Sequence, residues 1–429
     1  MEANRDDAPA RFAWLPPGLR PSVTMTRRVE RVILLVGAAA FFAGYDQNVF
    51  GLAIPQIQAS LHIAENQVGL TVAYFRLATG VALLIAASAD LVGRRRLLLV
   101  TLFGQAIFTL ATAFTQDYAQ FVWAQVGTRI FGYAEEMLCY VVIAEEVAAA
   151  ARGWSNGALS ALYYLGAGAA ALVFMAVNIL PFGWRAIYAV GAIPLFFVAY
   201  LRRRLPETTR FTAREGAMQA ASKFTTTVKM LGELTTQYPA RIFTVVVAAG
   251  AFGFAISPAT VLGSKYLQSV YRFAPWQASA MMIACGLVSI GLAILSGKLS
   301  DRIGRKPVAF AIVALAGVAF YFFYSGAPTI WMPFLWLLAF FGFFSGDALL
   351  AGFALEIVPT TYRATVSGLR YVVEISLGAL SLALEGRLYD VFGAHGPAIQ
   401  VMLAAIPITL VAILFLPEPA GRSLEEMAR

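Results

Sequence analysis

Apolar windows about 20 residues long recur along the whole sequence and constrain the fold more than any other feature. Of its 429 residues, 59% are hydrophobic and 13% are charged. A helix needs about 20 apolar residues to cross roughly 30 Å of hydrocarbon, whereas barrel strands are short and alternate every second residue. The sequence therefore predicts an all-α membrane protein with twelve transmembrane helices, at 32–54, 67–88, 97–115, 119–147, 154–179, 184–201, 241–267, 276–297, 307–325, 329–355, 364–388 and 398–416.

Basic residues gather in alternate loops between these spans, and positively charged loops of membrane proteins stay in the cytoplasm. We therefore expect both termini and every even-to-odd loop to be cytoplasmic, in a multi-pass protein of the cell (inner or plasma) membrane. Because the basic residues of these loops account for the net charge of +8, no nucleic-acid partner is expected. The N-terminal segment has no apolar core, so no cleavable signal peptide is expected. The residues that set this topology are Arg27, Arg28, Arg31, Arg94, Arg95, Arg96, Arg152, Arg202, Arg203, Arg204, Arg302, Arg305, Lys306 and Arg363.

The two halves of the sequence repeat each other at one constant offset. Asp90 corresponds to Asp301, and Glu145 with Arg152 corresponds to Glu356 with Arg363, each displaced by 211 residues. Such a repeat predicts two six-helix bundles with a solute site between them near the middle of the membrane. The expected segments are an N-terminal segment (1–31), two bundles (32–201 and 241–416), a cytoplasmic linker (202–240) and a cytoplasmic tail (417–429).

The loop after the eighth span carries a motif of the form G-x-x-x-D-R-x-G-R-K, which we call the loop signature. Its residues are Gly297, Asp301, Arg302, Gly304, Arg305 and Lys306. The first-half copy keeps Asp90, Gly93, Arg94 and Arg95, but has Ala86 and Leu91 at the other two positions. With these loops the chain resembles the major facilitator superfamily over nearly its whole length. The resemblance implies transport by alternating access, with both signature copies and Glu145, Arg152, Glu356 and Arg363 acting at a cytoplasmic gate.

Further motifs point to two branches of that superfamily. Pro206-Glu207-Thr208 with Arg210, and the ending PEPAGRSLEEM, are similar to sugar porters and aromatic-acid:proton symporters, with Pro419 and Ala420 as departures. The span 1 element GYDQNVFG resembles elements of both branches, although Ala43 stands where the symporters have a first acid. The resemblance implies that Asp46 pairs with Arg129 of the fourth span and couples protons to transport.

Several charges lie well inside the spans. Counting 1.5 Å per residue places Asp46, Arg129 and Arg76 at a similar depth, roughly 12–15 Å below the outer surface. One arginine can pair with Asp46, which leaves the other for an anionic group of the solute. Arg129 and Glu136 are seven residues apart and share a helix face, whereas Glu135 lies about 100° away.

A second layer of charges lies deeper, and charges inside a membrane often line a pathway. We expect Glu135, Glu136 and Asp347 to assist proton coupling, and the solute to contact Arg76, Tyr163, Tyr164, Arg370 and Glu374. Arg370 and Glu374 also make an i,i+4 pair. The alternatives left open are a purely structural ion-pair network for the charges and ordinary packing for the tyrosines.

The remaining polar residues in the spans are interpreted as structural. Lys265, Glu385 and Arg387 lie near outer ends and are expected to snorkel towards the interface, and His62 and His395 are expected at the surface. Cys139 and Cys285 fall inside spans, so no disulfide, metal site or cofactor is expected. No nucleophile–base set is apparent, and the chain is not expected to be an enzyme.

These features favour a proton-coupled symporter of a small organic acid or related polar metabolite, acting as a monomer in the lipid bilayer. The alternatives are a sugar or polyol:proton symporter, an uncoupled facilitator and, more distantly, a membrane sensor that does not transport. The stretch FGFAISPATVLGSKY (252–266) lacks the QQ-x-x-G and Asn elements of sugar porters, and GAGAAALV (166–173) lacks the Gly-Pro element of drug antiporters. The sequence leaves an anionic, a neutral and a cationic solute open.

Overall fold

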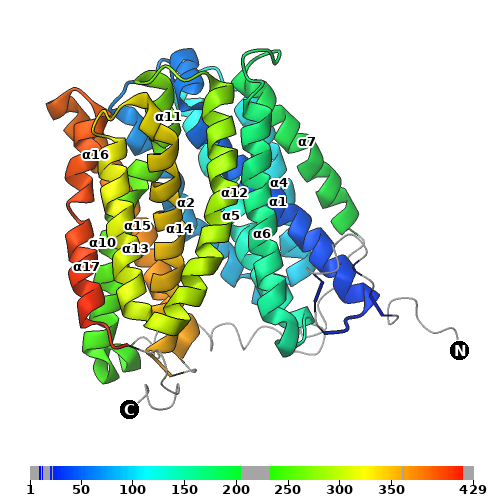
Figure 1. The fold of residues 1–429 in the computed structure, drawn as a ribbon. Helices are drawn as coiled ribbons and strands as arrows, with labels where there is room; N and C mark the ends of the chain where they lie inside the picture. The colour runs from blue at the N-terminus through cyan, green and yellow to red at the C-terminus, as the bar shows by residue number, and fades with distance from the viewer. Residues whose placement is uncertain are drawn as a thin grey trace, which may run out of the picture. The chain divides into compact units, whose positions relative to one another are not determined.

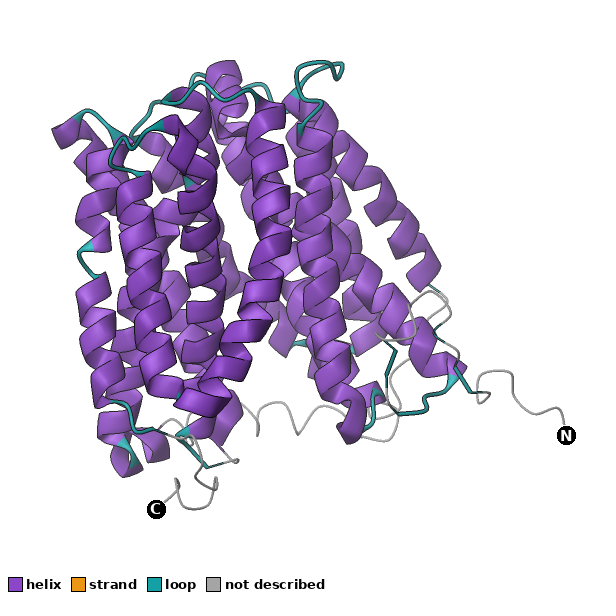
Figure 2. Cartoon of the chain, in the orientation of Figure 1, coloured by secondary structure: helices purple, strands orange, loops and turns teal. Residues whose placement is uncertain are grey.

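The computed structural model describes residues 9–10, 12, 20–21, 23–203, 232–359 and 362–418. Within these ranges the chain is helical and contains no strand, which confirms the predicted all-α membrane fold (Figure 2). The expected motif residues Pro206, Glu207, Thr208, Arg210 and Pro419 lie outside the described residues, as do the side chains of Asp90 and Arg152.

Eleven helical segments of the described ranges are long and apolar enough to cross a membrane. The helix α5 (Tyr118–Glu146) matches the remaining predicted span; it is not among the eleven, and it carries Arg129, Glu135 and Glu136. The other elements are α1 (Arg27–Leu61), α2 (Gln67–Ala87), α3 (Ala89–Val92), α4 (Arg94–Ala113), α6 (Ala149–Phe174), α7 (Trp184–Arg202), α10 (Pro239–Val261), α11 (Gly263–Ser269), α12 (Pro275–Ile303), α13 (Arg305–Phe323), η2 (Thr329–Trp331), α14 (Met332–Glu356), α15 (Arg363–Phe392), α16 (His395–Leu403) and α17 (Ile406–Phe415) (Figure 1).

Two of the expected continuous spans are interrupted. The span expected at 398–416 is divided into α16 and α17, and Pro407 lies in the first turn of α17. Proline has no backbone N–H and cannot continue a helix from the preceding turn. The span expected at 241–267 is divided into α10 and α11 after Pro258.

The chain forms two compact units. Unit 1 comprises residues 1–52 and 78–222, and unit 2 comprises residues 53–77 and 223–429. Unit 2 therefore includes the last turns of α1 and the first half of α2, which the sequence analysis placed in the N-terminal bundle. Close backbone contact accounts for this: a Cβ atom on Gly69 would meet the Leu382 carbonyl, and one on Gly386 would meet the Asn66 carbonyl. Small residues allow such close packing of membrane helices.

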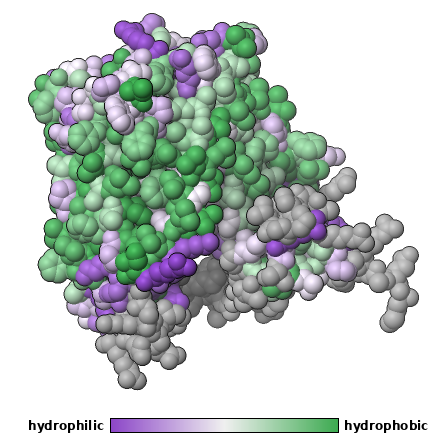
Figure 3. Space-filling model, in the orientation of Figure 1, coloured by the Kyte–Doolittle hydropathy of each residue, from purple (hydrophilic) through white to green (hydrophobic). Residues whose placement is uncertain are grey.

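Each unit has an apolar interior and an apolar exterior. In unit 1, α4 packs against both α5 and α7, and in unit 2 α10 packs against α15 and α13 against α14. On α12, Leu287, Ile290 and Ile294 are more than half exposed. Figure 3 shows hydrophobic surface along the helices and hydrophilic residues near their ends, as expected for helices surrounded by lipid.

The glycine of each loop signature makes a turn that other residues disfavour. Gly93 has φ 97° and precedes α4, and Gly304 has φ 119° and precedes α13. Residues with a side chain rarely adopt positive φ. The carboxylate of Glu418 also lies 3.1 Å from the place where a Cβ atom of residue 304 would be. The sharp turn between α12 and α13 therefore depends on glycine.

Gly304→Ala is expected to lower the free energy of unfolding by roughly 1–2 kcal/mol, because alanine is strained at positive φ. Gly297→Ala, in the same signature, is the matched control. A Cβ atom there meets no described atom within 4 Å, and alanine is preferred inside a helix. Thermal unfolding of the purified protein in detergent measures both, and equal unfolding temperatures for the two variants would contradict the account of this turn.

Candidate functional site

Asp46 of α1 lies in the interior of unit 1, with 1% of its surface exposed. The hydroxyl group of Thr109 on α4 donates a hydrogen bond to its Oδ1 atom at 3.1 Å. Arg129 on α5 is close enough to interact electrostatically with the carboxyl group. The structure thus brings together the two residues, Asp46 and Arg129, that the resemblance pairs.

The position of α1 in unit 1 is fixed by close contacts of the residues just before Asp46. A Cβ atom on Gly44 would meet the Tyr163 carbonyl of α6, and one on Gly166 would meet the Phe41 carbonyl of α1. Tyr45 donates a hydrogen bond to the carbonyl of Ile187 on α7 at 2.9 Å. Packing against α6 and α7 therefore holds Asp46 towards α4 and α5.

Gln47, which the sequence analysis did not select, connects three expected site residues. Arg129 donates to its backbone carbonyl at 3.1 Å, and the hydroxyl of Tyr163 donates to its Oε1 atom at 3.0 Å. Its Nε2 atom donates to Glu136 at 3.5 Å. Arg129 and Glu136 thus face the same helix, α1, as their spacing predicts. A polar side chain next to Asp46 in an apolar span was the signal that could have identified Gln47.

Tyr163 and Tyr164 differ in their surroundings. The Tyr163 hydroxyl lies against Gln47, whereas Tyr164 is 49% exposed and packs edge-on against the Tyr163 ring at 5.7 Å between centroids. Of these two tyrosines, Tyr163 therefore joins the polar group around Gln47.

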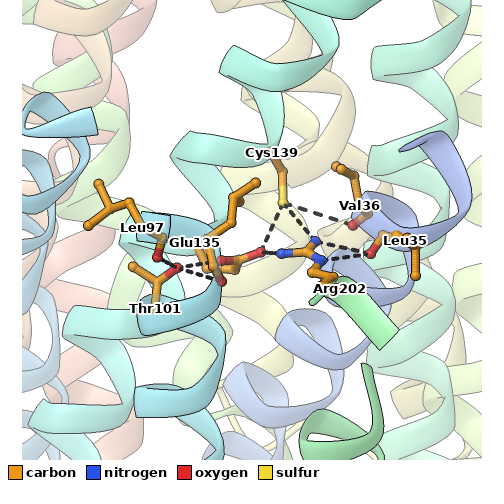
Figure 4. Close-up of polar contacts among 8 residues, drawn as sticks. Leu35, Val36, Leu97, Thr101, Glu135, Cys139 and Arg202 are labelled. Atoms are coloured by element: carbon orange, nitrogen blue, oxygen red, sulfur yellow. Dashed lines mark hydrogen bonds and ion pairs between the residues drawn. The ribbon is translucent and has the colours of Figure 1, made fainter. Parts of the chain in front are cut away.

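Glu135 belongs to a separate network, shown in Figure 4, and not to the group that contains Glu136. It forms an ion pair with Arg202 of α7, and both side chains are fully buried. Thr101 donates to its Oε2 atom at 2.5 Å, and the Cys139 thiol lies 3.4 Å from Oε1. Arg202 also donates to the Leu35 carbonyl at 3.0 Å. These contacts form a buried ion-pair network, and the expected role of Glu135 in proton coupling stays a prediction beside the structural alternative.

The interpretation of Arg202 as a basic loop residue is therefore wrong. Arg202 begins the run Arg202–Arg203–Arg204 but is the last residue of α7, with 1% of its surface exposed. A buried carboxylate needs a partner, because breaking a buried ion pair costs about 3–5 kcal/mol. Glu135 supplies the reason that this arginine turns inwards.

In unit 2, a second group of charges surrounds Arg370. Its guanidinium group donates to Asp347 at 2.7 Å and to Glu374 at 2.8 Å. Arg76 of α2 donates to the Ser257 hydroxyl at 2.7 Å and is close enough to Glu374 for electrostatic interaction. Arg76 thus lies with the charged residues of unit 2. Gly378 of α15 makes room for Arg76.

The two loop signatures form equivalent ion pairs within their own units. Arg94 donates two hydrogen bonds to Glu145, at 3.2 and 2.9 Å, and Arg305 donates two to Glu356, at 3.2 and 3.1 Å. Arg305 also pairs with Asp301 at 2.5 Å. These pairs keep the 211-residue offset and are bidentate, the geometry that suits a guanidinium group and a carboxylate.

The remaining expected gating residues differ in their surroundings, and Lys306, like Arg305, contacts Glu418, which the sequence analysis did not single out. The Glu418 carboxylate accepts hydrogen bonds from the backbone N–H groups of Arg305 and Lys306, both at 2.8 Å, and so caps α13. Arg302 is exposed, and Arg95 donates to the Arg203 carbonyl at 2.5 Å. Arg363 is partly buried.

Four charged side chains of unit 2 form a group that we call the loop cluster: Glu65, Lys265, Glu385 and His395. Lys265 of α11 pairs with Glu65 of the α1–α2 loop, and His395 lies between Glu65 at 2.9 Å and Glu385 at 2.6 Å. Lys265 and Glu385 are buried and His395 is mostly buried. The expectations that Lys265 and Glu385 snorkel and that His395 lies at the surface are therefore wrong. Lys265 and His395 are held by Glu65, far away in the sequence, and Glu385 is held by His395.

The loop cluster also acts on the ionisation of Glu65. Burial raises the pKa of this carboxyl, but hydrogen bonds from His395 and Lys265 and the charge of Lys265 outweigh the burial and lower the pKa from 4.5 to about 2. Its ionised form therefore stabilises the fold above pH 4.5, and this contribution is lost as the pH falls towards 2.

Glu65→Gln is expected to lower the unfolding temperature above pH 4.5, and the difference from the wild type should shrink as the pH falls towards 2. Thermal unfolding in detergent across this range measures it. Asp390→Asn is the control, because Asp390 is exposed and accepts a hydrogen bond from Asn66. A difference for Glu65→Gln that does not change with pH would refute the role assigned to the carboxylate.

No three acidic, histidine or cysteine side chains in the described ranges are grouped as ligands for a metal ion. The chemistry available at Asp46, Gln47 and Arg370 is the transfer of a proton to or from the Asp46 carboxyl group and hydrogen bonding to a polar or charged solute.

Comparison with known proteins gives consistent results. The sequence model of the Major Facilitator Superfamily matches residues 36–382 and 293–426. A Haemophilus influenzae protein whose name states no more than metabolite transport is 28% identical, over 91% of this chain and 97% of its own length. A citrate-proton symporter of Salmonella typhi is 27% identical, over 89% and 93%. A 3-(3-hydroxy-phenyl)propionate transporter of Escherichia coli is 27% identical, over 89% and 94%.

The fold also resembles solved structures. A D-xylose-proton symporter superposes with a TM-score of 0.73 at 16% identity, covering 92% of this chain and 99% of that one. A nucleoside transporter superposes with a TM-score of 0.73 at 12% identity, covering 89% and 99%. At these identities the likeness concerns the fold alone.

Proposed function

Because the chain belongs to the major facilitator superfamily, we propose that this multi-pass membrane protein is a proton-coupled symporter of a small organic acid. It acts by alternating access, as a monomer in the cytoplasmic membrane, with both termini in the cytoplasm. The observation that carries the proposal is Asp46: a fully buried carboxyl group beside an arginine, with one hydrogen bond from Thr109.

The surroundings of Asp46 suit reversible protonation. A buried charge is stable only when it is paired or hydrogen-bonded. The carboxylate therefore depends on Arg129 and Thr109, and any movement that weakens the contact with Arg129 favours the neutral acid. Gln47 connects the same arginine to Tyr163, so a solute that binds at Tyr163 acts directly on the partner of Asp46.

An organic anion is the solute class that the charges and the relatives favour. A guanidinium group donates two parallel hydrogen bonds to a carboxylate. Arg76 already contacts the neutral hydroxyl group of Ser257, a partner that a solute carboxylate can replace. The named relatives from Salmonella typhi and Escherichia coli are transporters of citrate and of 3-(3-hydroxy-phenyl)propionate, both of which are organic acids.

A sugar or polyol is the second candidate solute. Gln47 and Tyr163 form a neutral hydrogen-bonded pair, and an amide beside a phenol suits hydroxyl groups. A thermal-stability screen of purified protein against aromatic and aliphatic carboxylates, sugars and organic cations separates the candidates. Stabilisation by sugars alone would replace the organic-acid proposal.

Asp46→Asn is expected to abolish solute accumulation driven by an imposed proton gradient, because the amide cannot take up the proton. Counterflow exchange of the solute found in the screen should remain, since it needs no net proton movement. Uptake and counterflow in proteoliposomes measure both, and Glu136→Gln is the comparison for the neighbouring acid. Accumulation that persists in Asp46→Asn would show that another acid carries the proton.

Arg76→Gln is expected to weaken binding of the solute by roughly 10–150-fold, the loss of about 1.5–3 kcal/mol for a hydrogen bond to a charged group. Arg76→Lys should restore little, because an ammonium group has no bidentate geometry. Arg387→Gln removes the same charge at an exposed position and is the control. Equal affinity in the wild type and both Arg76 variants would reject anion recognition by Arg76.

A further inference from the structure

A buried row of polar side chains lies between α4 and α5 of unit 1, and we call it the polar seam. All of its members are fully buried: Thr101, Gln105, Thr109 and Thr112 of α4, and Gln125, Thr128 and Glu135 of α5. The α4 residues are three or four positions apart and so lie on one helix face. Over 11 residues at 1.5 Å each, the seam extends about 16 Å along α4.

Contacts along the seam follow the register of two antiparallel helices. Gln125 donates to Thr112 at 3.1 Å, and Thr101 donates to Glu135 at 2.5 Å. Between these pairs, a Cβ atom on Gly132 would lie 3.2 Å from the Gln105 amide nitrogen, so this glycine makes room for the amide. Thr109 occupies the level between Thr112 and Gln105 and donates to Asp46. The seam therefore leads from Asp46 to Glu135.

Gln105 is the member whose polar atoms most need a partner. Among the described residues, neither its Oε1 nor its Nε2 atom has a hydrogen-bond partner, and the same holds for Oδ2 of Asp46. Buried polar groups are nearly always hydrogen-bonded, and water is the usual partner where the protein supplies none. The Gln105 amide and the Asp46 carboxyl therefore have hydrogen-bonding capacity that ordered water can satisfy.

The repeat shows that the fold itself does not require this polarity. At the 211-residue offset, Thr101, Gln105, Thr109 and Thr112 correspond to Ile312, Ala316, Phe320 and Phe323 of α13. All four are buried, and α13 packs against α14 as α4 packs against α5. Unit 2 thus builds the equivalent helix pair with apolar side chains, and the polar seam of unit 1 needs a reason other than packing.

We propose that the seam between Thr109 and Glu135 binds a chain of water through which Asp46 exchanges its proton with the end of unit 1 where α7 ends. The proton leaves Oδ2 of Asp46 for the adjacent water. Each water, held by Gln105 and Thr101, then passes one of its own protons onwards. The last proton enters solvent beside Arg203, which is exposed, and Asp46 is left as the carboxylate.

The charges around this route are compatible with a passing proton. Glu135 carries a negative charge at the far end of the seam, and the ion pair with Arg202 stabilises that charge in the buried interior of unit 1. Near Asp46, Arg129 and the hydroxyl of Tyr188 are close enough to interact electrostatically with each other and with the carboxyl group. The seam would thus separate the proton route from solute contacts at Gln47. The proposed water chain rests on the proposed proton coupling at Asp46.

Infrared spectroscopy of the purified protein tests the proposal with solvent as the probe. At a pH at which Asp46 is protonated, its carboxyl band is assigned by its loss in Asp46→Asn, and its exchange is followed after transfer to D2O. Gln105→Leu is expected to slow this exchange roughly tenfold, equivalent to about 1.4 kcal/mol in the barrier. Thr101→Val, at the far end of the seam, should slow it in the same direction and is the second variant should Gln105→Leu not fold.

Thr112→Val is the matched control, because Thr112 is equally buried on the same face of α4 but lies beyond Asp46 from Glu135. The Asp46 carboxyl group of this variant should exchange its proton at the same rate as in the wild type. Equal exchange in the wild type, Gln105→Leu and Thr101→Val would overturn the water chain and leave proton coupling intact. A wild-type protein without an Asp46 band at any pH would overturn both.

Discussion

The buried pair of Glu135 and Arg202 is the interaction on which the arrangement of unit 1 depends. It joins α5 to the end of α7, and through the Leu35 carbonyl it also holds α1. A lone charge in this position would cost at least about 2.5 kcal/mol in hydrocarbon, so the pair favours the meeting of the three helices at this point. Once they do, α1 presents Asp46 and Gln47 to α4 and α5, and the separation of Glu135 from Glu136 follows from the 100° between neighbouring residues of a helix.

The two units use the same construction at their loop signatures and different constructions inside. Arg94 with Glu145 and Arg305 with Glu356 occupy equivalent positions. In the interior, the position of Asp46 corresponds to Ser257 at the same offset. The titratable group in contact with Thr109 therefore has a neutral counterpart, and that counterpart accepts a hydrogen bond from Arg76. Unit 1 thus supplies the proposed proton site, and unit 2 supplies arginines for the proposed solute site.

Sequence reasoning predicted the features that short-range patterns determine. The apolar windows gave the helices, and the fixed offset identified the equivalent residues of the two loop signatures. The spacing of Arg370 and Glu374 predicted their contact. The spacing of Arg129 and Glu136 predicted that they share a helix face. Each of these depends on helical periodicity or on repetition, which can be read along one chain.

The misplaced residues have partners that no local pattern indicates. Arg202 is 67 residues from Glu135, and His395 is 330 residues from Glu65. Arg202 stands in a basic run and His395 beside an expected loop, so composition alone favoured the surface. Their burial depends on how α7 and α16 pack, which the sequence does not encode in any short segment. Gln47 and Gln105 were missed for a different reason: a single amide in an apolar span carries no charge and is a weak signal of a functional site.

The central claim, that solute entry carries protons through this protein, is tested most directly by measuring pH inside proteoliposomes. A pH-sensitive dye is trapped inside, and an inward gradient of the ionised carboxylate from the stability screen is applied, with protein-free liposomes as the control for passive entry. The account predicts that the interior becomes acidic only when the protein and the solute are both present. Solute entry with no change in pH, or with an interior that becomes alkaline, would contradict it.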